Sequence, residues 1–295
     1  MNKFSFAGLD FIFDKEMRPY FLEANSFPGI FIWHELYKNI KPVKTLEKYL
    51  KKRKCENIVL LTPKRYLKTE TSINLIKNGL KKLDVHICLI KENEKSIKRN
   101  SAKLVDIDGN IIKADSLLRR KPLFKYNPEN VIEINSPEVI RVTRNKWLSY
   151  LAIRNAFIRS PTSFLVKNMS NVERALKENE RMFKKGFVLK PTTGEKGSGI
   201  RIVKDISKID NIEIKKPYLL QKIVNIKKMK GDYWDLRAFV VGGKYIGSML
   251  RVSESPVTNI SLGGVVKEVP GEIENKIKKR AEKCVKVIEN FSEML

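Results

Sequence analysis

Residues 8–29 read GLDFIFDKEMRPYFLEANSFPG, and this stretch is the most informative part of the sequence about the fold. It predicts two strands joined by a turn, and the second strand ends in a carboxylate and an amide two residues apart, Glu23 and Asn25. Successive side chains of a strand alternate between the two faces of a sheet, so Glu23 and Asn25 point the same way. The stretch is therefore predicted to be a β-hairpin with a polar face near its end.

The register of this hairpin decides whether Asp10 joins that polar face. If the turn closes symmetrically, with Phe13 opposite Tyr20, Asp10 lies directly opposite Glu23. Two facing carboxylates repel each other unless a cation lies between them, and oxygen ligands without histidine or cysteine favour Mg²⁺. The pattern predicts a metal site of Asp10, Glu23 and Asn25. The alternative is a surface hairpin whose polar residues simply face water.

Composition places the chain among ordinary globular proteins. Its 295 residues are 42% hydrophobic and 31% charged, enough for two or three domains that each have a core. No apolar run approaches the roughly 20 residues of a membrane helix, which excludes a membrane partner, and Asp10 interrupts any signal-peptide core. Three widely separated cysteines without a C-x-x-C motif favour a reducing cytoplasm.

The net charge of +26 is the most unusual compositional feature. One interpretation is a nucleic-acid partner. However, acidic residues are mixed into the lysine-rich stretches 44–54 and 276–286, and the sequence has no run of aromatics interleaved with basic residues. The charge is better explained by lysines spread over solvated helix faces, with anionic small substrates as an intermediate interpretation.

Residues 55–134 are predicted to form a small α/β domain of the doubly wound type. Apolar strands are expected at 57–62 and 85–90, with a helix over 69–83 between them, which is the pattern of a parallel unit. Residues 33–54 before it look like a helical connector. The domain has no glycine-rich phosphate fingerprint, so no nucleotide is assigned to it.

A glycine-rich turn in the middle of the chain suits phosphate binding. A buried strand over 186–191 ends in Lys190 and a proline, TTGEKGSG follows at 192–199, and a second strand covers 200–203. Glycines let backbone N–H groups approach an anion, and the lysine supplies positive charge. A plain turn between two strands is the alternative.

Two elements flank this turn in the sequence. Ser136 and Pro137 predict the start of a helix that carries Lys146, with a second helical stretch running to Arg159. Residues 218–223 predict a strand that could line an adenine ring with backbone groups and apolar side chains.

A second polar hairpin is predicted over residues 234–251, with a Gly-Gly turn. Asp235 and Arg237 share one face of it. A three-residue loop would place Arg251 opposite Asp235 on that face, whereas a two-residue loop would place Arg251 on the other side. The alternative to a functional cluster is a surface Asp–Arg pair worth well under ~1 kcal/mol.

Taken together, these stretches resemble the ATP-grasp superfamily, most closely its glutathione-synthetase and RimK-like (ribosomal-protein glutamate ligase) branch. The resemblance covers about two-thirds of the chain, with six motifs in the expected relative order. It implies an α/β and α+β protein in which two α+β subdomains grip ATP after a small doubly wound domain. The implied divisions are 1–32 (metal-binding hairpin), 33–54 (connector), 55–134 (preceding α/β domain), 135–222 (first ATP-grasp subdomain) and 223–295 (second subdomain).

One departure from the family concerns the order of the segments. In that family the Asp…Glu-x-Asn hairpin comes last, after the long helix, whereas here the helix ends the chain and the hairpin opens it. The chain therefore resembles a circularly permuted ATP-grasp protein, which requires its two ends to meet in space. The alternatives are a fused fragment that lacks its own tail, and a homodimer in which a second copy completes the site.

The resemblance implies a carboxylate–amine ligase that forms an amide through an acyl phosphate and releases ADP. The acceptor would be a small-molecule or peptide carboxylate, and the amine an amino acid such as glutamate. The implied cofactors are ATP and Mg²⁺, with two ions expected and Mn²⁺ as a substitute. The implied metal ligands are Asp10, Glu23 and Asn25, and the implied ATP contacts are Lys146, Lys190, Gly194, Gly197, Ser198, Gly199, Gln221, Lys222 and Ile223. The implied catalytic residues are Arg237, Arg251 and Asn259.

Two rival hypotheses remain at this point. The first is a basic protein that uses the fold to hold nucleotide or nucleic acid without catalysis. The second is an incomplete ligase whose permuted ends fail to assemble the metal site.

Overall fold

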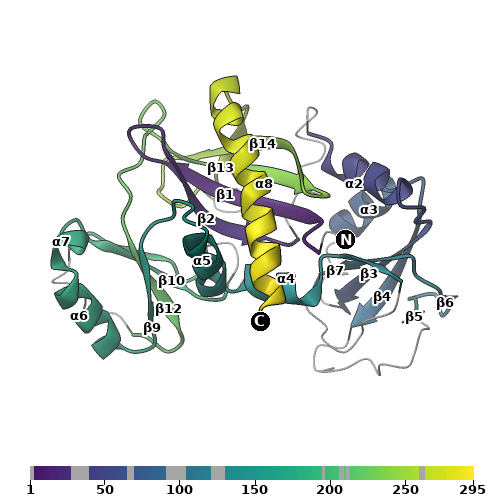
Figure 1. The fold of residues 1–295 in the computed structure, drawn as a ribbon, viewed down its shortest axis with the longest axis horizontal. Helices are drawn as coiled ribbons and strands as arrows, with labels where there is room; N and C mark the ends of the chain where they lie inside the picture. The colour runs from purple at the N-terminus through teal and green to yellow at the C-terminus, as the bar shows by residue number, and fades with distance from the viewer. Residues whose placement is uncertain are drawn as a thin grey trace.

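The computed structural model describes residues 3–27, 40–64, 70–90, 104–120, 130–194, 197–205, 209, 213–258 and 263–295. Three sheets follow one another across the molecule, each with its own hydrophobic core (Figure 1). The predicted mixture of a parallel α/β sheet and antiparallel α+β sheets is confirmed.

The central sheet is antiparallel and has the strand order β15-β14-β13-β1-β2. Its strands are β1 (Phe6–Phe13), β2 (Pro19–Asn25), β13 (Tyr233–Val241), β14 (Lys244–Ser253) and β15 (Val265–Lys267). The first strand of the chain thus lies between β2 and a strand that begins 227 residues later, at Tyr233. Helices α4 (Pro137–Arg144), α5 (Lys146–Asn155) and α8 (Gly271–Glu293) contact this sheet or one another (Figure 1).

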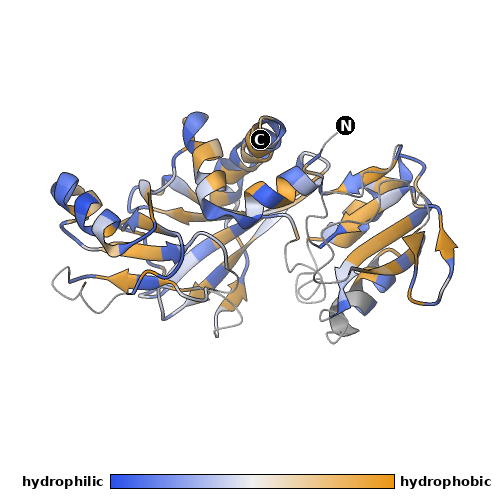
Figure 2. Cartoon of the chain, turned by 90° about the horizontal axis from the view of Figure 1, so that it is seen from below, coloured by the Kyte–Doolittle hydropathy of each residue, from blue (hydrophilic) through white to orange (hydrophobic). Residues whose placement is uncertain are grey.

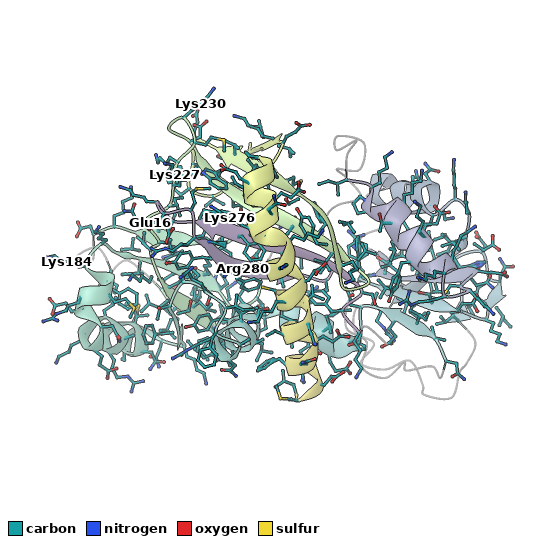
Figure 3. The ribbon with its side chains drawn as sticks, turned by 45° about the horizontal axis from the view of Figure 1, so that its top comes forward. Glu16, Lys184, Lys227, Lys230, Lys276 and Arg280 are labelled. Carbon is teal, nitrogen blue, oxygen red and sulfur yellow. The ribbon has the colours of Figure 1, made fainter. Side chains whose placement is uncertain are left out.

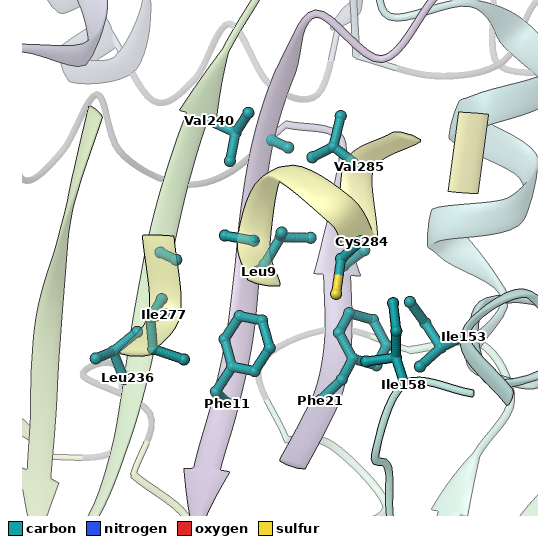
Figure 4. Packing of buried hydrophobic residues seen from close by; sticks show 14 of the residues in the cluster. Leu9, Phe11, Phe21, Ile153, Ile158, Leu236, Val240, Ile277, Cys284 and Val285 are labelled. Carbon is teal, nitrogen blue, oxygen red and sulfur yellow. The ribbon is translucent and has the colours of Figure 1, made fainter. Parts of the chain in front are cut away.

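The core beneath these helices combines side chains from both ends of the sequence. Figure 4 shows Leu9 and Phe11 of β1 packed with Ile277 and Cys284 of α8. Phe4, Leu9, Phe11 and Phe13 are at most 1% exposed. Burying a side chain of this size contributes roughly 1.5–3 kcal/mol, so the opening strand is a central part of the fold.

The two ends of the described chain touch. Lys3 Nζ lies 3.2 Å from a carboxylate oxygen of Glu293, and the backbone N–H of Lys3 donates to the side chain of Glu289. The first strand therefore starts where the last helix finishes, which is the condition that the predicted permutation requires.

A smaller antiparallel sheet has the order β11-β10-β12-β9. It consists of β9 (Ser163–Val166), β10 (Phe187–Pro191), β11 (Arg201–Val203) and β12 (Tyr218–Lys222), with helices α6 (Met169–Glu178) and α7 (Glu180–Phe183) beside it. Phe183 and Phe187 meet edge to face in its core, with ring centroids 6.4 Å apart.

The third sheet is parallel, with the order β4-β3-β7-β8. Its strands are β3 (Asn57–Pro63), β4 (Asp84–Ile90), β7 (Ser116–Arg119) and β8 (Ile132–Ile134), and its helices are α2 (Pro42–Lys51) and α3 (Glu70–Gly79). β5 (Leu104–Val105) and β6 (Ile111–Ile112) pair as a short antiparallel hairpin beside this sheet. These strands are mostly orange in Figure 2, as expected for a sheet that is covered on its faces.

Asn135 connects the parallel sheet to the central one. Its amide nitrogen donates to the backbone oxygens of Phe6 (2.8 Å) and Ser26 (2.6 Å), and its amide oxygen accepts from the Phe6 N–H (2.9 Å). The side chain is fully buried, and it fixes both ends of the β1–β2 hairpin to the end of β8.

Candidate active site

The β1–β2 hairpin brings Asp10 opposite Glu23, as the sequence predicts, but it reaches this register differently. The turn pairs Phe13 with Pro19 rather than with Tyr20, so the predicted symmetric closure is wrong by one residue. A bulge between Asp10 and Phe11 absorbs the difference. Beyond the bulge, the Asp10–Glu23 pair has the expected register.

The β13–β14 hairpin compensates in the same way. Its turn has the two residues Gly242 and Gly243, because Val241 pairs with Lys244. This turn alone would place Arg251 on the wrong face, but the register shifts between Phe239 and Val240. Arg251 therefore lies opposite Asp235 after all.

Asp10, Asp235, Arg237 and Arg251 form one network of ion pairs on the polar face of the central sheet. Arg237 donates to both carboxylate oxygens of Asp10 at 2.7 Å. Arg251 Nη2 lies 2.9 Å from Asp10, and its Nε donates to Asp235 at 2.6 Å. These pairs are not at the surface, because Asp10, Asp235 and Arg251 are at most 5% exposed.

Electrostatics keep the Asp10 carboxyl ionised at neutral pH. Burial by itself raises its pKa, but Arg237 and Arg251 outweigh that effect and hold the pKa below its ordinary value. Asp10 also interacts with the side chain of Glu23. An ionised Asp10, paired with two arginines, therefore lies beside a second, more exposed carboxylate.

Two lysines reach this carboxylate pair from other elements. Lys146 Nζ donates to the Gly194 backbone oxygen at 3.0 Å and lies 3.6 Å from Glu23. Burial lowers the pKa of Lys190 to about 8, while the charge of Glu23 acts in the opposite direction. Lys146, Lys190 and Glu23 thus come together from α5, β10 and β2, as the resemblance implies.

Lys146 begins a helix of its own instead of continuing the one that starts at Pro137. Asn145 interrupts the predicted helix, and its side-chain oxygen accepts from the backbone N–H groups of Trp147 and Leu148. Such a cap starts a new helix. The first turn of α5 therefore carries Lys146, and α5 ends at Asn155, before the predicted end at Arg159.

The glycine-rich turn follows directly from Lys190. Gly194, Gly197 and Gly199 have φ values of 156°, 75° and 74°, a region that glycine adopts at little cost, and Ser198 between the last two is exposed. A Cβ atom on Gly199 would lie 2.9 Å from the Pro191 side chain. Residues 195 and 196 lie outside the described part of the chain.

Gln221 and its neighbours lie at the end of β12. Gln221 is 5% exposed, and its amide nitrogen donates to Ser163 Oγ at 2.9 Å. The Lys222 N–H donates to the Thr162 oxygen at 2.9 Å, while Ile223 is half-buried. Their predicted contact with adenine stays a prediction, as does the role of Asn259, which lies outside the described residues.

The donor set suits a hard divalent cation. Glu23 and Asn25 lie two residues apart on β2, and the buried Asn25 amide nitrogen has no hydrogen-bond partner. Within the described ranges, no group of three Asp, Glu, His or Cys side chains gathers into a metal cluster. A metal site of two carboxylates and an amide oxygen would favour Mg²⁺ or Mn²⁺ over Zn²⁺.

Comparison with known proteins identifies the family. Residues 143–292 match the RimK-like ATP-grasp domain, a range that contains the two lysines, the glycine-rich turn and both arginines. The chain belongs to the RimK-like ATP-grasp family. The β1–β2 hairpin lies outside the matched range. The predictions of an ATP-grasp fold and of an ATP-dependent carboxylate–amine ligase are therefore confirmed.

Two relatives show how far the similarity extends. A tetrahydromethanopterin:alpha-L-glutamate ligase of Methanococcus maripaludis is 26% identical over 64% of this chain and 69% of its own length. Human N-acetylaspartylglutamate synthase A is 31% identical over 46% of this chain, a match that spans 35% of the human protein.

Solved structures support the fold. A protein from Methylobacillus flagellatus, described as a gamma-glutamylcysteine synthetase, superposes with a TM-score of 0.61 over 98% of this chain and 88% of its own, at 14% identity. D-alanyl-alanine synthetase A from Vibrio cholerae gives a TM-score of 0.55 over 79% of this chain and 81% of its own, at 14% identity. None of the described helices is long and apolar enough to cross a membrane.

Two buried residues of the network, Asp235 and Thr258, were not predicted to belong to the site. Thr258 Oγ1 donates to Asp235 at 2.7 Å, and Asp235 in turn fixes Arg251. The available signal was the spacing of Asp235 and Arg251 in the hairpin, which fixes their register but does not show that the pair is buried.

Proposed function

We propose that this ATP-grasp ligase joins the amine of glutamate to a small carboxylate acceptor, using ATP and Mg²⁺. One observation carries the proposal. Lys146 contacts both Gly194 of the glycine-rich turn and Glu23 of the opening hairpin. A phosphate-binding turn and a metal-type carboxylate thus share one lysine.

The residues divide into three roles in this proposal. Lys146, Lys190 and the turn with Gly194, Gly197, Ser198 and Gly199 bind phosphate oxygens. Gln221, Lys222 and Ile223 border the adenine. Glu23 and Asn25 hold Mg²⁺, with Asp10 beside them, and the cation neutralises charge on the phosphates when it is bound.

The two arginines are not equivalent. Arg251 is 4% exposed and is held by Asp10 and Asp235, so its role is to position Asp10. The Arg237 side chain is 13% exposed and uses Nε and Nη2 on Asp10, which leaves its remaining nitrogen for a substrate oxygen. Arg237 is the better candidate for contact with the acceptor carboxylate.

The reaction needs no covalent enzyme intermediate. An oxygen of the acceptor carboxylate attacks the γ-phosphorus of ATP, and ADP leaves. The glutamate amine then attacks the acyl carbon, phosphate leaves, and the amine loses a proton to form the amide. Glutamate as the amine is inferred from relatives named as glutamate ligases. The acceptor is one of the small carboxylates that such relatives use.

The opening hairpin belongs to this same site, and we attribute its position in the sequence to circular permutation. The contacts of Lys3 with Glu289 and Glu293 support this, and β1 pairs with β13 of its own chain. No second copy is required for the contacts described above. The cytoplasmic location remains a prediction.

ADP release tests the proposal. The purified chain is incubated with Mg²⁺, ATP, glutamate and a panel of carboxylates that includes N-acetylaspartate and citrate, and products are identified by mass. ADP release should require both glutamate and an acceptor, with an amide product in equal amount. ATP hydrolysis that ignores both substrates would contradict ligation.

Paired glutamate variants test the site. Glu23→Gln should lower turnover by at least about 10²–10³-fold, because it removes a ligand charge beside the phosphates. Glu16→Gln is the control, since Glu16 lies in the turn of the same hairpin and is 63% exposed (Figure 3). Equal activity of the two variants, with unchanged melting temperatures, would remove Glu23 from the site.

A further inference from the structure

Helix α8 separates its charges between its faces. Its acidic side chains are tied inward: Glu274 accepts from the Tyr245 hydroxyl at 2.8 Å, Glu282 accepts from the Tyr245 N–H at 3.0 Å, and Glu293 pairs with Lys3 at 3.2 Å. Most acids of the helix are therefore paired with other elements, whereas the exposed Glu272 lies four residues before Lys276, at the N-terminal end of the outer face.

The outer face of α8 is a row of lysines. Lys276, Lys279, Lys283 and Lys286 recur every three or four residues, which places them on one side of the helix over about 15 Å. All four are exposed, and none forms an ion pair with a residue that the structure describes. Like charges at this spacing repel each other, so a polyanion laid along them would relieve the repulsion.

An exposed aromatic side chain follows α5, the helix that contacts α8. Figure 4 shows Cys284 of α8 packed near Ile158. Burial raises the pKa of the Cys284 thiol to about 12, while the positive charges of Arg280 and Lys283 lower it. The residue before Ile158 is Phe157, which is 97% exposed with a φ of 55°. The chain therefore holds a phenyl ring in water, on a backbone conformation that bulky residues avoid, at the margin of the basic helix.

Two arginines lie close to Phe157 in the sequence. Arg154 and Arg159 lie three residues before and two residues after it, and both are exposed. The guanidinium of Arg159 lies 5.6 Å from the centroid of the Tyr20 ring. Because α5 contacts α8, the exposed Arg154 and Phe157 at the end of α5 and the lysines of α8 belong to neighbouring helices (Figure 3 labels Lys276 and Arg280 of α8).

We propose that this surface binds single-stranded nucleic acid, with phosphates along Lys276, Lys279 and Lys283 and an unpaired base stacked on Phe157. Lysines spaced along a helix neutralise a phosphate backbone, and an exposed ring offers a stacking platform that a duplex cannot use. A lipid surface fits less well, because the outer face of α8 between residues 276 and 286 carries no exposed apolar side chain to insert.

This surface is separate from the ligase site. Leu9 and Phe11 of β1 face the core under α8, so Asp10 between them faces the opposite side of the sheet. Nucleic acid bound on α8 therefore leaves the phosphate lysines accessible, and variants of the surface should keep their basal ligase activity.

Fluorescence anisotropy with a labelled 20-nucleotide oligo(dT) tests the proposal on the full chain. Binding should weaken about 20-fold between 50 and 200 mM salt if three phosphates are neutralised. The triple variant Lys276→Glu, Lys279→Glu, Lys283→Glu should bind at least tenfold more weakly and with a shallower salt slope. Its melting temperature and ADP release should match those of the parent.

A matched control distinguishes binding at this surface from an effect of the total net charge. Lys44, Lys48 and Lys51 form a similar exposed row on α2, so Lys44→Glu, Lys48→Glu, Lys51→Glu changes the total charge equally. This variant should keep nearly full affinity. An equal loss in both triple variants would overturn the proposal, as would parent binding to phosphatidylserine vesicles but not to the oligonucleotide.

Phe157→Ala tests the stacking contact. It should weaken binding about 5- to 100-fold without changing the salt slope, and Phe157→Tyr should restore the affinity. The ring is almost fully exposed, so its removal should not change stability. Unchanged oligonucleotide affinity in Phe157→Ala would overturn the stacking part of the proposal.

Discussion

The β1–β2 and β13–β14 hairpins lie side by side in the central sheet, and each contributes carboxylates to its polar face. On β13, Asp235 is buried and is held by Arg251 and Thr258. On β2, the Glu23 side chain is 32% exposed and lies 3.6 Å from the Lys146 ammonium. The first carboxylate serves to build the site, and the second retains the capacity to bind a ligand.

Asp10 connects the two hairpins. It lies on β1, pairs in register with both Glu23 and Arg237, and is held by two arginines. The β13–β14 hairpin therefore fixes the position of the β1–β2 hairpin. The difference between them indicates that exposure, rather than residue type, separates supporting carboxylates from reacting ones.

Deleting the β1–β2 hairpin gives the largest expected effect, and relocating it should reverse that effect. Deleting residues 1–27 should abolish folding, because it removes both β1 and β2 from one side of β13, together with four nearly fully buried apolar side chains of β1 (Phe6, Leu9, Phe11 and Phe13). Appending these residues after Leu295 through a short flexible linker should restore both the fold and ADP release, since the ends already touch. Circular dichroism and the ADP assay measure the two outcomes.

A transplanted protein that folds but releases no ADP would contradict the permutation. A matched control carries a scrambled 27-residue segment at the same position, and it should not recover the fold.

Removing the charge of Asp10 should give the next largest effect. Asp10→Asn leaves Arg237 and Arg251 without their shared partner, so the free energy of unfolding should fall by about 3–5 kcal/mol. Asp14→Asn in the same hairpin should cost only about 1 kcal/mol, because Arg18, its partner, is half exposed. Urea unfolding measures both, and equal losses would show that the arginine network is not stabilising.

The pH dependence of ATP binding tests Lys190. Burial lowers its pKa to about 8, and only the protonated form attracts phosphate. The affinity for a non-hydrolysable ATP analogue should therefore fall as pH rises above 8, by up to about tenfold per unit, until the pKa of the complex is reached. Calorimetry between pH 7 and 9.5 measures this, and Lys190→Arg should flatten the profile. If Lys190→Arg gave the same pH profile as the parent, Lys190 would not be the group whose protonation controls the affinity for ATP.

The smallest expected effect concerns Thr258. Thr258→Val removes the hydroxyl that donates to Asp235, which should lower the free energy of unfolding by about 1 kcal/mol. Thr45→Val, at the exposed start of α2, is the control and should cost less. A larger loss in the control would show that the β13 carboxylate does not depend on its hydroxyl partner.

Alternation along strands made the polar face predictable from the sequence. The sharing of a face by Asp10, Glu23 and Asn25, and the pairing of Asp235 with Arg251, follow from a period of two residues. The bulges were not predictable, because a residue that leaves the ladder has no distinct chemistry of its own. The prediction of the Asp10–Glu23 pair was right although its assumed turn was wrong.

Burial and long-range contacts were the other limits. The Asp235–Arg251 pair looks like a surface pair in the sequence, yet both residues are buried once β1 and residue 258 cover them. Phe157 was not singled out, because only the folded chain shows that its ring is 97% exposed at the end of a helix that contacts α8. The role of Lys146 came from family resemblance, and Asn145 as the cap of a new helix was overlooked.

The two compensating bulges imply a parity rule for this sheet. Adding or removing one residue between Asp235 and Arg251 would turn the arginine from the reactive side towards the core, while two residues would leave it in place. Related chains can therefore differ in turn length without loss of activity, provided that each insertion or deletion of an odd number of residues is matched by a second one in the same hairpin. Alignments that count only gap length would miss this constraint, whereas counting gaps as odd or even would reveal it.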